Sequence, residues 1–187
     1  MAIAPSTVVR PLDPNPANLF TIFSNLGTGK NVYTDNVGWD VAGPDSGVSE
    51  EWIAMPFTPT SDAEVTQISV AIQHNTGSPN SFVLGLNRDS GGLPGKVIRK
   101  WEVKHLPRFG TCCTLDVVGD TKGLKVKRGT QYWVAAETNS SERKTRDEWD
   151  LAYARVEGRF AIDANGQGWY QYTAFTSAFG VFGKKTR

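Results

Sequence analysis

The stretch SFVLGLNRDSGGLPGKVIRKWEVKHL, residues 81–106, indicates the fold class of this chain. Runs of aliphatic, β-branched and aromatic residues at 81–88 and 96–106 flank a segment rich in Asp, Gly and Pro. Such runs form strands, whereas glycine accepts positive φ, proline fixes φ and Asp caps its own backbone in turns. The stretch therefore predicts two strands joined by a tight turn.

The turn contains Asp-Ser-Gly-Gly at 89–92, which is the pattern around the nucleophile of trypsin-like serine proteases. That chemistry needs a histidine base, a carboxylate that orients it and oxyanion donors. The two histidines, His74 and His105, lack the Ala-Ala-His-Cys context, and 187 residues are few for a double barrel. We therefore interpret Ser90 as a turn residue and expect no enzymatic activity.

Glycoside hydrolysis is a second reaction that paired acids could support, and it needs two carboxyl groups about 5–10 Å apart across a cleft. Glu50 and Glu51 are neighbours, so on a strand they face opposite ways. The sequence sets no distance between Glu102 and Asp116. No positive feature favours a glycosidase.

Composition excludes several classes of protein. The chain has 39% apolar residues and a net charge of +1, so nothing favours nucleic acid or an anionic membrane as a partner. It contains no run of 18 apolar residues, so membrane insertion is not expected. The first residues lack the basic and apolar regions of a signal peptide, which leaves a cytosolic protein or a removed signal open.

Strand-like runs separated by turn residues recur along the whole chain, for example at 64–75, 129–139 and 168–175. They predict an all-β protein, an antiparallel β-sandwich of jelly-roll type with about nine or ten strands. Four prolines at 4–16 predict an extended arm or linker over residues 1–18. Residues 19–187 are then a single domain.

Three motifs resemble a known family: FVLGLNRDSGGLPGKVIRKWEV (82–103), GLKVKRGTQYWVAAE (123–137) and GWYQYTAFTSAFGVFG (168–183). The combination is similar to the "choice-of-anchor" type of bacterial extracellular β-sandwich, over roughly the last two-thirds of the chain. The resemblance implies a secreted or cell-surface protein and a non-catalytic structural or adhesive module. Its partner would be a glycan or another surface protein, and no catalytic residues are implied.

A carbohydrate-binding module is the alternative function. Aromatic rings in polar loops stack on the apolar face of a pyranose, and neighbouring polar groups bond its hydroxyls. The other reading is that the tryptophans close the ends of the hydrophobic core. The candidate ligand-binding residues are Trp39, Trp149, Trp169, Asp147, Asp150 and Asn165.

A calcium ion is the one cofactor left open. Asp163 and Asn165 occupy the first and third places of a pattern typical of EF-hand loops, but residue 174, where the closing acid belongs, is alanine. A hairpin turn built on Asn165-Gly166 is the other reading. We therefore assign no metal. The weak candidates are Asp163, Asn165 and Asp89, or a set drawn from separate loops with Asp35, Asp40 and Asp45.

The two cysteines are adjacent, Cys112 and Cys113, so a disulfide framework and a CxxC metal or redox site are excluded. Neighbouring residues of a strand point to opposite faces, which strains an ordinary disulfide. One buried thiol and one surface thiol are expected, with a vicinal disulfide as the alternative.

Overall fold

The computed structural model describes residues 4–5, 8–11, 18–118 and 121–186, and this part of the chain is built from strands and turns without a helix. The all-β prediction is therefore confirmed. In chain order the strands are β1 (Ala4–Pro5), β2 (Val8–Pro11), β3 (Phe20–Ser24), β4 (Tyr33–Ala42), β5 (Glu51–Phe57), β6 (Ala63–Val70), β7 (Ile72–Thr76), β8 (Ser81–Ser90), β9 (Leu93–Lys104), β10 (Thr114–Val118), β11 (Lys125–Val126), β12 (Tyr132–Glu137), β13 (Arg146–Ala152), β14 (Glu157–Ala164), β15 (Tyr170–Phe175) and β16 (Phe179–Lys185).

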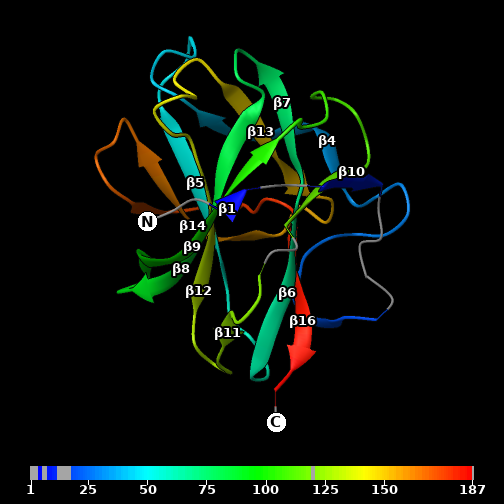
Figure 1. Cartoon of the computed structure of the whole chain (residues 1–187). Helices are drawn as coiled ribbons and strands as arrows, with labels where there is room; N and C mark the ends of the chain where they lie inside the picture. The colour runs from blue at the N-terminus through cyan, green and yellow to red at the C-terminus, as the bar shows by residue number, and fades with distance from the viewer. Residues whose placement is uncertain (1–3, 6–7, 12–17, 119–120, 187) are drawn as a thin grey trace.

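The strands form two sheets (Figure 1). The large sheet runs β1-β9-β8-β12-β5-β4-β13-β7, and β14 leaves this path by pairing with β5 and carries β15 at its outer edge. The small sheet runs β2-β10-β6-β16-β3, with β11 added to β6. Every pairing between these strands is antiparallel except that of β1 with β9. The predicted antiparallel β-sandwich agrees with this arrangement.

The hydrophobic core lies between the sheets. On β5 and β12, Ile53, Met55 and Val134 point into it, whereas Ala54 and Ala135 point to the outer face of the large sheet. The small sheet contributes Ile68, Val70 and Val181. This alternation follows from the two-residue period of a strand, and burial of these side chains stabilises the fold by about 25 cal/mol per Å² of apolar surface.

The described residues contain sixteen strands instead of the nine or ten expected. One reason is that residues 64–75, expected as one strand, are divided at Ala71 between β6 of the small sheet and β7 of the large sheet. Another is that β4 contains several polar residues and is not among the expected strands. It is a strand because β13 pairs with it over most of its length.

The turn between β8 and β9 agrees with its prediction. Ser90 pairs with Leu93, and Gly91 and Gly92 between them have φ of 65° and 84°. A two-residue turn with positive φ at both central positions is of type I′, which suits the twist of a hairpin. Asp89 accepts a hydrogen bond from the Gly92 amide at 3.1 Å, so it caps the turn as expected.

Parts of the predicted arm lie within the sheets. Ala4–Pro5 pairs with β9, and Val8–Pro11 pairs with β10. The remaining residues of 1–17 lie outside the described part of the chain.

Within the part that is described, nothing forms a helix of the length and apolar character that a membrane crossing needs.

Candidate functional site

A cavity of about 550 Å³ opens beside the start of β4. We call it the disulfide pocket, because Cys112 and Cys113 form part of its wall. Three separate segments of the chain build it, within residues 29–36, 112–113 and 153–155, and they lie by β4 and just before β10, which Figure 1 labels. Its lining residues are Gly29, Lys30, Tyr33, Thr34, Asp35, Asn36, Cys112, Cys113, Tyr153 and Arg155.

The wall of the pocket is held by a buried glutamine. Gln73 of β7 donates from Nε2 to the Thr111 carbonyl at 2.7 Å, and its Oε1 accepts from the amides of Gly110 and Thr111 at 2.7 and 3.3 Å. Nε2 also donates to the Tyr33 hydroxyl at 3.0 Å. Because buried polar groups are costly when unpaired, these bonds fix the conformation of residues 110–111.

Tyr33 forms the floor of the pocket and is almost fully buried. Its hydroxyl accepts a hydrogen bond from the Thr114 amide at 2.9 Å and lies 3.1 and 3.0 Å from the carbonyl oxygens of Thr111 and Thr114. Burial raises the pKa of Tyr33 to about 12, so the phenol stays neutral. The floor and the wall are therefore tied to each other by direct hydrogen bonds.

Cys112 and Cys113 form a vicinal disulfide. Cys112 is exposed and Cys113 is half-buried, so the expectation of one buried thiol and one surface thiol is wrong. The two Sγ atoms lie 3.7 and 3.5 Å from the Lys30 carbonyl oxygen. The disulfide therefore lies against the loop that brings Lys30 to the rim of the pocket.

The groups that a ligand would meet in the pocket are of three kinds. Tyr153 is an aromatic ring, 50% exposed. Lys30 and Arg155 are exposed cations that make no ion pair with any described residue. Asp35 and Asn36 supply carboxylate and amide groups. Together they offer a surface for stacking, two positive charges and several hydrogen-bonding groups.

A bulge in β4 places the last two residues there. Asp150 of β13 pairs with Gly38 of β4, but the next residue, Leu151, pairs with Thr34. Three residues of β4, 35–37, therefore have no partner in β13, and a bulge of this kind turns side chains away from the regular strand direction. Asp35 and Asn36 line the pocket as a result.

The structure does not bring the three candidate tryptophans together. Trp149 lies in β13 and not in a loop, and it is fully buried against Phe179. Trp39 lies on the core side of the large sheet, next to Phe160 and Tyr172. Trp169 packs on the opposite, outer face of that sheet with Trp133. These rings cannot form one stacking platform.

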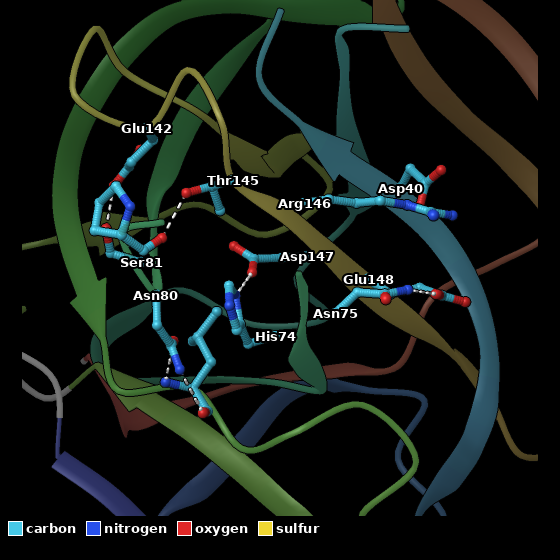
Figure 2. Close-up of polar contacts among 12 residues, drawn as sticks. Asp40, His74, Asn75, Asn80, Ser81, Glu142, Thr145, Arg146, Asp147 and Glu148 are labelled. Atoms are coloured by element: carbon cyan, nitrogen blue, oxygen red, sulfur yellow. Dashed lines mark hydrogen bonds and ion pairs between the residues drawn. The ribbon is translucent and has the colours of Figure 1, made fainter. Parts of the chain in front are cut away.

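The candidate acids Asp147 and Asp150 are fully buried, so neither is placed to bond a ligand at the surface. Figure 2 shows that neighbouring side chains of β13 point to opposite sides: Asp147 contacts His74, whereas Glu148 contacts Asn75. Both were candidates because they flank Trp149 at the edge of a polar segment, and charged residues are rarely buried without a partner. The pairing of β13 between β4 and β7 is what buries them.

Burial changes the ionisation of this group of acids. It raises the pKa of Asp150 to about 9, an effect that the nearby carboxyl groups of Glu148 and Asp35 increase. It also raises the pKa of Asp147 to about 7, against the lowering effect of the hydrogen bond with His74. Asp116 is fully buried, and its pKa lies well above the usual value for the same reason, with a further contribution from Asp147. Burial thus favours the protonated form of all three carboxyl groups.

The calcium candidates lie in different environments. Asp163 accepts a hydrogen bond from the Gly168 amide at 3.0 Å, and Asn165 is exposed with a φ of 57° in the hairpin turn between β14 and β15. Asp89 accepts hydrogen bonds from Gln131 and Trp133 besides Gly92. Asp40 and Asp45 pair with arginines. Within the described residues no three His, Cys, Asp or Glu side chains are placed to hold a metal ion.

Ser90 lies far from the histidine that follows β9. It is exposed at the tip of the β8–β9 hairpin, and the other end of that hairpin, Ser81 with Lys104, is nine residues away along β8. At about 3.3 Å per residue this is about 30 Å from the position of His105. His74 belongs to β7, which β12, β5, β4 and β13 separate from β8.

A smaller cavity of about 310 Å³ contains a second serine, Ser81, together with His105 and Asn80. The Ser81 hydroxyl donates to Glu142 Oε1 at 2.7 Å, and the other oxygen of Glu142 accepts from the Asn139 amide at 2.8 Å (Figure 2 shows the bond to Ser81). No histidine among the described residues is hydrogen bonded to this hydroxyl. The carboxylate thus holds the 139–142 turn to β8.

No protein-family model matches the chain, and a search of curated proteins found no match. Sequence reasoning missed the residues of the disulfide pocket apart from the cysteines and Asp35. The only signals were the adjacent cysteines and a tyrosine, Tyr153, close after the strand around Trp149.

Proposed function

We propose that this chain is a non-catalytic adhesive module of a secreted or surface-exposed bacterial protein, and that it adheres by holding a carbohydrate in the disulfide pocket. The observation that carries the proposal is a cavity that combines an exposed ring, Tyr153, with polar side chains that have no partner among the described residues. The volume of about 550 Å³ falls within the usual range of small-ligand sites, about 300–1,000 Å³.

The chemistry of the lining favours a sugar. A pyranose presents an apolar face that stacks on an aromatic ring, and its hydroxyls need donors and acceptors around the rim. Tyr153 supplies the ring, Asp35 accepts hydrogen bonds, and Asn36 both donates and accepts them. The hydrogen bonds of Gln73 and Tyr33 keep the wall and the floor in place before a ligand arrives, which lowers the entropic cost of binding.

An exported protein is supported by the disulfide between Cys112 and Cys113. Disulfides persist in oxidising environments and are rare in the reducing cytosol. The non-catalytic part of the proposal is supported by the positions of the serines and histidines, which do not form a catalytic arrangement. Ser90 stands apart from both histidines, Ser81 is bonded to Glu142, and His74 is bonded to the buried Asp147.

A purely structural module is the second candidate. The burial of Trp149 and the separation of Trp39 from Trp169 favour it, because these aromatic rings complete the packing of the sandwich and do not face a ligand. On this alternative the disulfide pocket would be a surface depression with no ligand.

A glycan array probed with and without calcium separates the two candidates. Binding by the wild-type protein and its loss in Tyr153→Ala would establish the adhesive module. Tyr170→Ala is the matched control, because Tyr170 is 45% exposed on β15 and lies outside the pocket. A blank array, or binding that Tyr153→Ala leaves intact, would rule out the pocket as the adhesive site.

A further inference from the structure

The charges of the disulfide pocket point to the class of sugar. Lys30 comes from the turn before β4, and Arg155 comes from the turn after β13, yet both line one cavity. Asp35 is the one acidic residue among the lining residues, which leaves the pocket with one net positive charge. A neutral sugar would leave this charge without a counterpart.

Neither cation has a structural task in the described part of the chain. Arg143 forms an ion pair with Asp45 at 2.7 Å, and Arg146 forms one with Asp40 at 2.9 Å. Lys30 and Arg155 form none, although Asp35 lines the same cavity. Their side chains are therefore available to a ligand.

The backbone holds Arg155 at the rim. Its amide donates to the Ala152 carbonyl at 2.9 Å, which closes the turn after β13, and its φ is 48°. A non-glycine residue in this left-handed region is uncommon and costs free energy. The same turn carries Tyr153, so the ring and the guanidinium reach the pocket from one short segment.

We propose that the disulfide pocket binds a sugar that carries a carboxylate, such as a uronic or sialic acid residue. The carboxylate lies between Lys30 and Arg155, and the ring stacks on Tyr153. A guanidinium suits this role because its planar fork matches a carboxylate with two parallel hydrogen bonds, whereas an ammonium acts as a point charge. Asp35 and Asn36 then bond the hydroxyls.

This inference rests on the proposed function, since it names the ligand of the same pocket. Its test compares oligosaccharides of galacturonic, glucuronic or sialic acid with their neutral counterparts of the same length, by titration calorimetry at moderate salt. We expect at least one acidic member to bind at least tenfold more tightly than its neutral counterpart. Arg155→Gln and Lys30→Gln should each weaken the acidic ligand about tenfold and leave the neutral one unchanged.

Two matched variants control for charge alone. Arg159→Gln and Lys144→Gln remove exposed cations outside the pocket and should leave the affinity unchanged. Inorganic phosphate and polyglutamate serve as competitors without a sugar ring, and they should not displace the acidic sugar. Because all four residues are exposed, the variants should unfold at the wild-type temperature.

The possible results distinguish a failure of the acidic-sugar inference from a failure of the proposed function. Equal affinity for acidic and neutral sugars, or displacement by phosphate or polyglutamate, would overturn the acidic-sugar inference and leave the sugar-binding or anion-binding pocket in place. Unchanged affinity in both Arg155→Gln and Lys30→Gln would also overturn it. If no oligosaccharide binds, the proposed function falls together with the inference.

Discussion

The Nδ1 atom of His74 and the Oδ1 atom of Asp147 lie 2.7 Å apart, on neighbouring strands of the large sheet. Asp147 is fully buried and His74 is mostly buried, so two ionisable side chains lie together in the protein interior. The hydrogen bond with Asp147 raises the pKa of His74, against the opposing effect of burial. The second oxygen of Asp147 has no partner among the described residues.

Replacing Asp147 by asparagine should lower the pKa of His74. The amide keeps a hydrogen-bonding oxygen in place but removes the negative charge that favours protonated imidazole. We expect the variant to lose about 1–3 kcal/mol of stability, because a buried hydrogen-bonded charge pair is disrupted. Titration of the His74 ring protons by NMR measures the pKa. Glu148→Gln is the control, since its side chain contacts Asn75 on the other side of β13, and an unchanged His74 in Asp147→Asn would contradict the assignment.

The free energy of unfolding should increase as the pH is lowered from about 9 to about 5. Burial raises the pKa of Asp150 to about 9 and that of Asp147 and Glu51 to about 7, all from usual values near 4. A carboxyl group with a raised pKa binds its proton more tightly in the folded state, so its stabilising effect is full below pH 4 and is lost as the pH rises to the folded pKa.

Asp150→Asn tests the largest of these contributions. Neither oxygen of Asp150 has a partner among the described residues, and at pH 8, below its pKa of about 9, the carboxyl group must take up a proton on folding that it lacks in the unfolded chain. The variant should gain about 1–3 kcal/mol at pH 8 and show a flatter dependence of stability on pH. Urea unfolding at several pH values measures both. Asp45→Asn should leave the slope unchanged because Asp45 is exposed and paired with Arg143; a wild-type stability that rises with pH would contradict this account.

The sequence was sufficient for the local parts of the fold. The hairpin 81–106 follows from its own residues, because two apolar runs and a Gly-Gly turn are short-range signals. β4 escaped prediction because Asp35, Asn36 and Asp40 are rare in strands. What makes this segment a strand is pairing with β13, more than a hundred residues later in the chain.

The candidate site could not be predicted for the same reason. Tyr33, Cys113 and Tyr153 come from three segments that meet only in the folded chain. The tryptophans were wrongly expected to contact a ligand, because polar neighbours in the sequence suggest a loop. In a strand, however, the next residue faces the other way, so polar neighbours do not exclude a buried tryptophan. Trp149 therefore points into the core although charged residues stand on both sides of it.

Gln73→Leu should loosen the disulfide pocket without touching its ligand. The variant leaves the Gly110 amide without its partner, at a cost of about 1–3 kcal/mol. It also removes one of the two partners of the Thr111 amide, which still bonds the Arg108 carbonyl, and of the Thr111 carbonyl, which still faces the Tyr33 hydroxyl. We expect faster hydrogen exchange at residues 110–114 and at least tenfold weaker glycan binding. Gln67→Leu is the matched control, since the Gln67 side chain donates one hydrogen bond, to Ser69. Unchanged exchange at 110–114 in Gln73→Leu would show that the glutamine does not hold the wall.

Asp89 and Ser90 should behave oppositely when each is replaced by alanine. Asp89 accepts hydrogen bonds from the Gly92 amide at 3.1 Å, Gln131 Nε2 at 2.6 Å and Trp133 Nε1 at 2.8 Å, so it joins the β8–β9 turn to β12 and its approach. Burial acts to raise the pKa of Asp89, but these three hydrogen bonds outweigh it and lower the pKa. Asp89→Ala should therefore cost about 2–4 kcal/mol at pH 7, and this loss should diminish as the pH falls below about 4, where the unfolded carboxyl is protonated.

Ser90→Ala should change neither stability nor any hydrolysis of model esters, because its hydroxyl is exposed and bonds no described residue. Thermal unfolding and an ester-hydrolysis assay of both variants measure these effects, and esterase activity that disappears in Ser90→Ala would make the turn a catalytic element after all.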